Sequence, residues 1–305
     1  MPPPAIDVRA LRKSYGNVKA VSGIDLQVQA GEVFSLLGPN GAGKTTTVEI
    51  LEGHRKRSGG EVRVLGHDPG KGESSLKARI GIVLQETGVE RFLTVAEVID
   101  RFRGYYPAPR PLEEIIEVVG LQEKRDTRVR KLSGGQQRRL DVAIGLAGDP
   151  ELLFLDEPTS GFDPAARRNA WEMIRNLKNL GKTVFLTTHY MDEAQNLADR
   201  VAIIVGGRIV AEGPPGSLVG ADATKTKIRF KLPDGAPDLP PGAAQAAVET
   251  GGDVLIHTAD PLRLLHTLTG WALENDVALG DLSVNQPSLE DVYLELTGVG
   301  EKAWT

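Results

Sequence analysis

The sequence contains no cysteine among its 305 residues. Disulfide bonds and thiolate metal sites are therefore excluded, and the composition is compatible with a reducing compartment. No segment approaches the roughly 18 consecutive apolar residues that a membrane helix requires. The first residues, Met1-Pro2-Pro3-Pro4, lack the basic and apolar regions of a secretory signal peptide. We therefore expect no disulfide, no membrane span and no secretory signal.

A strong excess of basic residues is also missing. The net charge is −5, and it is unevenly divided: from Asp222 onward 6 basic and 13 acidic residues give −7, whereas residues 1–221 carry +2. A nucleic-acid-binding protein is expected to carry a large basic excess, so the sequence predicts no nucleic-acid partner. One local basic cluster is interpreted as a solvated helix face, with a positive rim that attracts nucleotide as the alternative. The cluster consists of Lys124, Arg125, Arg128, Arg130, Lys131, Arg138 and Arg139.

A glycine-rich segment fits the phosphate-loop pattern G-x-x-x-x-G-K-S/T: Gly38-Pro39-Asn40-Gly41-Ala42-Gly43-Lys44-Thr45. It lies between a short apolar run, residues 33–37, and a helical pattern from Thr46 to Glu52. In the order strand, loop, helix, backbone N–H groups and the helix dipole favour phosphate binding. Lys44 would supply a positive charge and Thr45 a hydroxyl group for magnesium. The alternative is an ordinary glycine-rich turn.

Two adjacent carboxylates, Asp156 and Glu157, follow the apolar run Leu152–Leu155, which is typical of a parallel strand buried on both faces. Neighbouring carboxylates repel each other, so the pair is costly unless a cation and a reaction use it. We expect Asp156 to hold magnesium and Glu157 to orient and polarise an attacking water as general base. The alternative is an acidic pair that caps a helix near Pro158.

The pentapeptide Leu132-Ser133-Gly134-Gly135-Gln136 has five specified residues in a row, which is rare by chance in a chain of this length. Together with the phosphate loop, it makes residues 5 to 215 resemble the nucleotide-binding subunit of an ATP-binding cassette (ABC) transporter. In that family the pentapeptide, called the signature, binds the nucleotide held by the phosphate loop of a second subunit. The resemblance thus implies a dimer of two copies that enclose ATP.

The same resemblance implies roles for further residues. Tyr15 matches an aromatic residue that stacks on adenine, and Gln85 matches a glutamine that contacts magnesium or the attacking water. His189 matches the switch histidine that contacts the γ-phosphate. Asp163 ends the loop Ser160-Gly161-Phe162-Asp163, which crosses to the other subunit and has Phe162 where the family usually has leucine. Taken alone, the tyrosine, glutamine and histidine would be a surface residue, a strand-end polar residue and a structural residue.

The expected cofactors are ATP and Mg²⁺, and no catalytic group of the family is replaced, so we expect a hydrolysing site. The expected catalytic residues are Lys44, Gln85, Glu157 and His189. The expected magnesium ligands are Thr45, Gln85 and Asp156. The expected nucleotide-binding residues are Tyr15, Gly38, Pro39, Asn40, Gly41, Ala42, Gly43, Lys44, Thr45, Thr46, Ser133, Gly134, Gly135, Gln136 and Asp163.

The predicted fold class is α/β, with a P-loop NTPase core of ABC type in residues 1–221 and a small α+β domain in residues 222–305. Alternation over residues 5–30 predicts an antiparallel β subdomain, and a helical subdomain is expected at about residues 86–148. Its helices are predicted from Val95 to Tyr105, capped by Thr94, and from Pro111 to Val119. Residues 201–205 and 208–211, joined by Gly206-Gly207, predict a hairpin.

Within residues 222–305 we expect three strands and two helices. The strands are predicted at Thr226–Leu232, at Val254–Thr258 and near Val277–Val284, and the helices at Pro261–Glu274 and Ser288–Leu296. The segment from Ser288 to Leu294 resembles the ending of the drug-resistance branch of these ATPases, although Ser288-Leu289-Glu290-Asp291 also suits a helix cap.

The resemblance therefore implies an ATPase subunit that powers an exporter of drugs or other hydrophobic compounds. It would work with separate transmembrane permease subunits and lie at the cytoplasmic face of the cell membrane as a peripheral protein. Two alternatives stay open: the ATPase of an ABC importer, and a soluble ABC ATPase with no role in transport.

Overall fold

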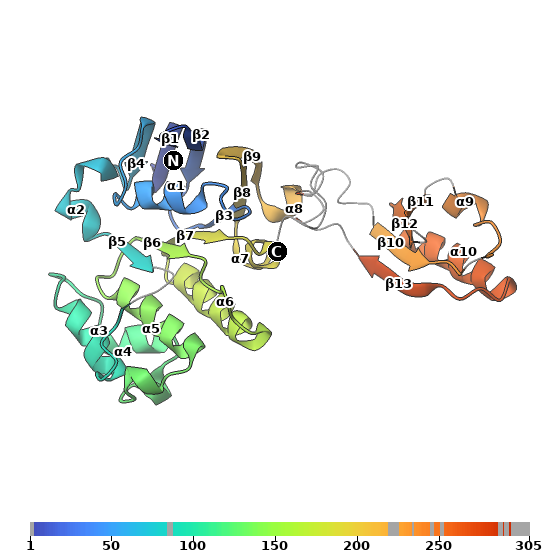
Figure 1. The fold of residues 1–305 in the computed structure, drawn as a ribbon. Helices are drawn as coiled ribbons and strands as arrows, with labels where there is room; N and C mark the ends of the chain where they lie inside the picture. The colour runs from blue at the N-terminus through green and yellow to red at the C-terminus, as the bar shows by residue number, and fades with distance from the viewer. Residues whose placement is uncertain are drawn as a thin grey trace. The chain divides into compact units, whose positions relative to one another are not determined.

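The computed structural model describes residues 3–83, 88–218, 226–233, 235–244, 247–250 and 253–285, together with Leu289 and Tyr293. The described residues form two compact units, one up to Pro215 and one from Gly216 onward. Figure 1 labels their helices and strands. The domain boundary proposed near residue 221 lies outside the described residues. No helix among the described residues is long and apolar enough to cross a membrane.

A six-stranded sheet forms the centre of the first unit. Its strands lie in the order β5 (Ile80–Val83), β6 (Leu152–Asp156), β7 (Thr183–Thr188), β3 (Val33–Leu37), β8 (Arg200–Val205) and β9 (Arg208–Gly213). All neighbours are parallel except β8 and β9, which form the expected hairpin. Every residue of β3 and β7 is buried, as expected for parallel strands covered on both faces.

A second, antiparallel sheet covers one side of this centre. It contains β2 (Val18–Val28), β1 (Ile6–Tyr15) and β4 (Gly59–Val64), so the antiparallel β subdomain is confirmed, with a third strand that the sequence did not predict. Helix α1 (Lys44–Leu51) lies between the two sheets in Figure 1. Its Val48, Ile50 and Leu51 share one apolar core with both.

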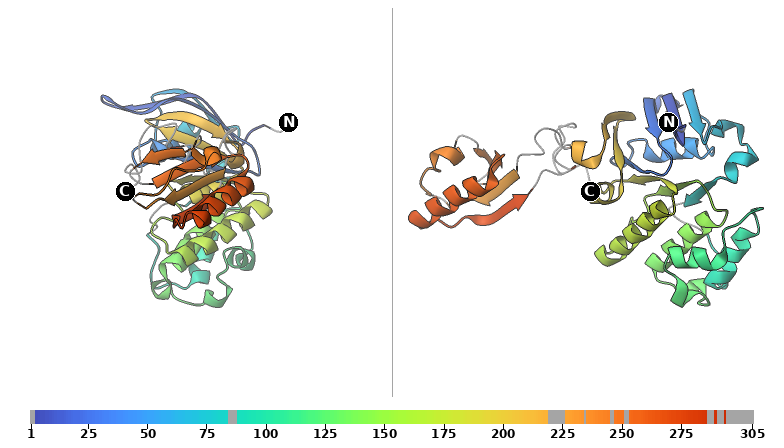
Figure 2. Two further views of the ribbon diagram at one scale, coloured as in Figure 1. Left: turned by 90° about the vertical axis from the view of Figure 1, so that its right-hand side faces the viewer. Right: turned by 180° about the vertical axis from the view of Figure 1, so that it is seen from behind.

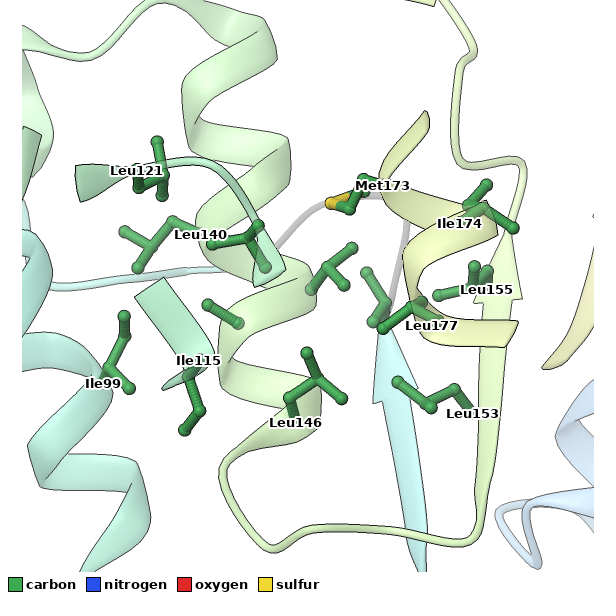
Figure 3. Close-up of a cluster of buried hydrophobic side chains, with 14 of the residues drawn as sticks. Ile99, Ile115, Leu121, Leu140, Leu146, Leu153, Leu155, Met173, Ile174 and Leu177 are labelled. Atoms are coloured by element: carbon green, nitrogen blue, oxygen red, sulfur yellow. The ribbon is translucent and has the colours of Figure 1, made fainter. Parts of the chain in front are cut away.

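Helices cover the opposite face of the large sheet, as the view from behind in Figure 2 also shows. They are α3 (Val95–Arg103), α4 (Leu112–Val118), α5 (Gly134–Leu146) and α6 (Pro164–Asn179). Thr94 caps α3 through a capping box with Glu97, as expected, and the helix ends two residues earlier than predicted. Figure 3 shows their common core, in which Ile99, Leu140 and Leu177 from three helices lie in one cluster with Leu153 and Leu155 of β6.

Short helices complete this unit and the start of the next. They are η1 (Pro69–Lys71), α2 (Ser74–Lys77), η2 (Gln122–Lys124), η3 (Val129–Lys131), α7 (Met191–Leu197) and α8 (Pro215–Leu218).

The second unit is a small α+β domain, as predicted. Its antiparallel sheet has the order β11 (Ala247–Thr250), β12 (Asp253–Thr258), β10 (Thr226–Lys231) and β13 (Gly280–Asn285), with α9 (Pro241–Ala244) and α10 (Pro261–Glu274). Alternate sheet residues and two leucines of α10 form its core: Ile228, Phe230, Val254, Ile256, Leu264 and Leu268. Of the helix predicted at Ser288–Leu296, only Leu289 and Tyr293 are described, and both are helical and buried.

The edge strand β5 approaches α5 so closely that a side chain does not fit between them. A Cβ atom on Gly81 would lie 2.3 Å from the backbone oxygen of Gly145 and 3.0 Å from Cγ of Pro150. Backbone cannot move aside as a flexible side chain can, so this glycine is required by packing.

We expect Gly81→Ala to lower the free energy of unfolding by about 1–3 kcal/mol, because the added methyl group forces α5 away from the sheet. Urea denaturation of the full chain, followed by tryptophan fluorescence, measures the change. Gly59→Ala in β4 is the matched control, since its Cβ would meet only Arg12 Cβ at 3.9 Å. Equal effects of the two substitutions would show that the close approach of β5 and α5 does not limit the packing.

Candidate functional site

The phosphate loop joins β3 to α1 at the carboxyl end of β3. Gly43, the residue before α1, has a φ angle of 106°. A Cβ atom on Gly43 would lie 2.4 Å from the backbone oxygen of Ala20, and one on Gly38 2.3 Å from that of Ile204. Both positions therefore require glycine, for conformation or for space. The first N–H groups of α1 lack acceptors within the helix and lie directly after the loop, where they favour an anion.

Lys44 is the first residue of α1, and its ammonium group is nearly buried, with 5% of the residue exposed. Nζ donates to the backbone oxygens of Gly38, at 2.8 Å, and Pro39, at 3.3 Å. It also lies 3.4 Å from Oε1 of Glu157. Burial lowers the pKa of Lys44, while the charges of Glu157 and Asp156 act in the opposite direction. The loop thus holds a cation that faces the acidic pair.

The acidic pair lies at the carboxyl end of β6, and a threonine of the next strand holds both members. Asp156 is paired in register with Thr187 of β7. The Thr187 hydroxyl donates to Oδ1 of Asp156 and accepts the backbone N–H of Glu157 at 3.1 Å. Thr187 was not among the residues predicted from the sequence, because its place beside Asp156 follows only from the register of β6 and β7.

Glu157 lies between Lys44 and His189, two of the other three catalytic candidates. Oε1 faces Lys44, and Oε2 lies 3.2 Å from Nδ1 of His189, at an angle that does not make a hydrogen bond. Its backbone is left-handed, with a φ angle of 44°, which is strained for a non-glycine residue and common at functional sites. Lys44 of α1 and His189, which follows β7, are therefore brought together around the carboxylate that follows β6.

Tyr15, the expected adenine-stacking residue, ends β1 and is 40% exposed. Two cations flank its ring: Nζ of Lys13 lies 4.9 Å from the ring centroid and Cζ of Arg55 lies 5.3 Å from it. The Arg55 guanidinium is itself held by Glu49 of α1. The aromatic surface is thus accessible and fixed to the helix that follows the phosphate loop.

The signature begins α5, where Ser133 is the N-cap residue. The Ser133 Oγ accepts the backbone N–H of Gln136 at 3.3 Å, and the Gln136 Oε1 accepts the backbone N–H of Ser133 at 3.0 Å. This capping box occupies both side chains in shaping the helix start. The N–H groups of Gly134 and Gly135 lie in the first turn, where a helix offers donors to an anion.

Two hollows border the signature. One lies between the start of α5 and the crossing loop, defined as residues 158–163, and is lined by Ser133, Gly135, Ser160 and Phe162 among others. The other is lined by Gly134, Glu157 and Phe162 with their neighbours. Neither is lined by a residue of the phosphate loop, Gly38 to Thr45.

Asp163 and Arg138 have structural roles within this region. Asp163 caps α6, with Oδ1 accepting the N–H groups of Ala165 and Ala166 at 2.9 Å each. Arg138, which the sequence analysis placed in a solvated face or positive rim, is instead 6% exposed. Its guanidinium donates to the backbone oxygens of Asp156, at 2.8 Å, and Pro158, at 3.3 Å. For this residue both interpretations of the basic cluster were wrong, because its side chain points toward β6.

The remaining expected residues fit a magnesium site only in part. On the first turn of α1, Thr45 is exposed and Thr46 is half-buried. Thr187 holds one carboxylate oxygen of Asp156, and Asp156 has a second one. A hydroxyl and a carboxylate suit Mg²⁺, which takes few protein ligands and keeps water and phosphate oxygens. Gln85 lies outside the described residues. Among those described, no three His, Asp or Glu side chains cluster as metal ligands.

Comparison with protein families finds two matches. Residues 21–160 match the family described as ABC transporter, and residues 226–288 match the family described as ABC transporter domain-containing protein-like, C-terminal domain. The two matched segments lie one in each compact unit.

Individual proteins resemble almost the whole chain. The daunorubicin/doxorubicin resistance ATP-binding protein DrrA of Streptomyces peucetius is 39% identical, over 97% of this chain and 93% of the relative. The Nod factor export ATP-binding protein I of Neorhizobium galegae is 45% identical, over 97% of this chain and 86% of the relative. Among solved structures, the ADP conformation of an ATP-binding cassette of an ABC transporter matches with a TM-score of 0.60. It is 25% identical and covers 69% of this chain and 91% of that one.

A buried carboxyl group at the end of α1 was not among the residues singled out from the sequence. Glu52 is 6% exposed, and its Oε2 lies 3.2 Å from Nδ1 of His54. Burial, together with the charges of Asp156 and Glu49, raises the pKa of Glu52 to about 8. The folded chain therefore keeps this group protonated at pH values where the unfolded chain has lost the proton.

Because the pKa of Glu52 is raised from an ordinary 4.5 to about 8, the folded state binds more protons than the unfolded state between those values. The free energy of unfolding therefore falls as pH rises through this window. Glu52→Gln removes this titration. The free energy of unfolding of the variant, relative to that of the unaltered chain, should therefore increase by about 2–4 kcal/mol from pH 5 to pH 8. Urea denaturation at both pH values measures it, with the exposed Glu61→Gln as control. A difference independent of pH would contradict the assigned protonation.

Proposed function

Because the chain belongs to the ATP-binding subunits of ABC transporters, which hydrolyse ATP, we propose that it powers an exporter of drugs or other hydrophobic compounds. The observation that carries the proposal is the extent of the likeness to the two export and resistance proteins. It spans 97% of this chain in both cases and so includes the C-terminal unit as well as the cassette. One of these relatives is named for resistance to daunorubicin and doxorubicin and the other for export of Nod factor.

The arrangement around Glu157 supports the hydrolytic role of the expected residues. With ATP in the phosphate loop, Lys44 would exchange its contact with Glu157 for the phosphate oxygens, where its charge is neutralised more fully. Glu157 would then be free to accept a hydrogen bond from the attacking water as general base, and His189 beside it would contact the γ-phosphate. During this step Thr187 holds the Asp156 carboxylate and the Glu157 backbone in place through its hydrogen bonds to both residues.

We assign the rest of the nucleotide site to the other expected residues. Tyr15 stacks on adenine, and the loop from Gly38 to Thr46 binds the phosphates. Mg²⁺, held by Thr45, Asp156 and Gln85, would supply charge neutralisation at the β- and γ-phosphates. The fit rests on the exposed hydroxyl of Thr45 and the second carboxylate oxygen of Asp156.

The signature is assigned to the site of a second copy. Ser133 and the N–H groups of Gly134 and Gly135 would donate to the γ-phosphate held by the partner, and Asp163 would lie in the loop that crosses to it. Supporting this assignment, neither hollow beside the signature is lined by the chain's own phosphate loop. ATP binding would then join two copies, and hydrolysis would release them.

Transport also requires partners that span the membrane. We propose separate transmembrane permease subunits, with this chain bound to them peripherally at the cytoplasmic face. The conformational work would come from the difference in ATP affinity between the closed and open dimer. No nucleic-acid partner is proposed, since neither part of the chain carries a large basic excess.

Glu157→Gln tests the proposed ATP hydrolysis and the proposed drug transport together. The amide cannot act as a base, so turnover should fall by at least about 100-fold, while the Kd for ATP should stay within about twofold. In cells that also carry the permease, the unaltered chain should lower daunorubicin accumulation and Glu157→Gln should not. ATPase assays, equilibrium ATP binding and drug accumulation provide the three readouts.

The control is Glu172→Gln, which changes an exposed glutamate of α6. It should leave turnover and accumulation as in the unaltered chain. Undiminished turnover of Glu157→Gln would refute its role as base. Drug accumulation that the active chain leaves unchanged or increases would refute drug export.

A further inference from the structure

Glu193 of α7 is fully buried, with 0% of the residue exposed, and is not used by the mechanism above. Its Oε1 accepts the hydroxyl of Thr159 at 2.8 Å. Its Oε2 has no hydrogen-bond partner within the described part of the chain. Burying a carboxyl group with one oxygen unsatisfied lowers the stability of the fold, and an apolar side chain would avoid this cost. The presence of the carboxyl group therefore points to a role other than stability.

The Glu193 carboxyl lies between two parts of the catalytic site. Thr159 is fully buried in the crossing loop, two residues after Glu157, and its backbone oxygen accepts the N–H of Phe162 at 3.1 Å. On the other side, α7 follows the switch histidine, and its N-cap residue Tyr190 donates its backbone N–H to Oγ1 of Thr188 at 2.9 Å. The Glu193 carboxyl thus joins the crossing loop to α7, which begins two residues after His189.

A second link runs parallel to the first on the surface. The Arg167 guanidinium of α6 lies 4.3 Å from the ring of Tyr190 and donates to Oδ2 of Asp192 at 3.1 Å. The Tyr190 ring in turn lies 4.0 Å from the ring of His189. Since α6 starts directly after the crossing loop, both links connect the same two segments. The buried link through Glu193 is the more rigid, because neither Thr159 nor the carboxyl group is exposed to water.

We propose that Glu193 is a positioning residue for ATP hydrolysis, which holds the crossing loop against the start of α7 so that Asp163 and His189 move as one body. The inference rests on the proposed function, in which the crossing loop reaches the second copy. A displacement of that loop on dimer closure would then be passed to His189 through Thr159, Glu193 and the start of α7. Without the carboxyl group, ATP would still bind the phosphate loop, but closure would no longer place His189 correctly.

The test compares the steady-state ATPase kinetics of the purified full chain with those of four variants. Glu193→Ala and Thr159→Val each remove the shared hydrogen bond and should lower kcat about tenfold, with KM and the Kd for ATP within about twofold. Because both act through one bond, the double variant should be no slower than Glu193→Ala alone. Glu193→Gln keeps an oxygen that accepts the Thr159 hydroxyl and should retain at least about a third of kcat.

Unfolding midpoints and Glu172→Gln, at the exposed α6 glutamate, serve as controls. A purely structural role would make the loss of kcat follow the loss of stability, would give no rescue by glutamine, and would make the effects of Glu193→Ala and Thr159→Val multiply. Any of these results, or unchanged kcat in Glu193→Ala, would overturn the proposal. A failure of the proposed function can be told apart from a failure of this proposal. It would appear as absent ATPase activity in the unaltered chain or as undiminished turnover in Glu157→Gln, both of which keep Glu193.

Discussion

The parallel pairing of β7 with β6 on one side and β3 on the other is the constraint on which the site depends. Its register places Thr187 beside Asp156 and Thr188 beside Leu37, so the three strands end together. The carboxyl ends of parallel strands are where α/β sheets bind ligands, because the following loops leave backbone and polar groups free there. The phosphate loop, the acidic pair and the switch histidine each follow one of these ends. A shift of one residue in the pairing of β6 with β7 would separate Thr187 from the two carboxyl residues it holds.

Apolar packing on both faces keeps that register. Residues of β6 alternate between two cores: Leu152 and Phe154 pack toward α1 and the antiparallel sheet, whereas Leu153 and Leu155 pack toward α3–α6. A slip would exchange the two sets, and each core is closely packed. Polar groups then extend the connection beyond the sheet. Arg138 attaches the signature helix to the backbone of β6 and its loop, and Glu193 attaches that loop to α7. Groups far apart in the sequence therefore act on one carboxylate, Glu157.

Local patterns were sufficient to predict many of the strands and helices and the phosphate loop, because glycine loops, apolar runs and caps depend on near neighbours. The role of His189 followed from the family resemblance. Helix α10 and the Thr94 cap follow from such signals. Tertiary partners were not predictable in the same way. Thr187, Glu193 and Arg138 are ordinary polar residues in the sequence, and only strand register and helix packing bring them to the acidic pair. Strand β4 was not predicted because it begins with Gly59 and Gly60, which are typical of turns. The buried Glu52 was not predicted because its burial depends on two sheets that close over α1.

The central claim is that one ATP site contains the phosphate loop of one copy and the signature of the other. The most direct measurement mixes two purified variants, Lys44→Ala, with a defective phosphate loop, and Ser133→Arg, with a defective signature. Each alone should hydrolyse ATP poorly, and Ser133→Arg should still bind ATP as a monomer. In a mixed pair, the intact phosphate loop of one chain meets the intact signature of the other, so the mixture should hydrolyse ATP well above the sum of the two variants. A mixture no more active than that sum, or loss of monomer ATP binding in Ser133→Arg, would contradict the shared site.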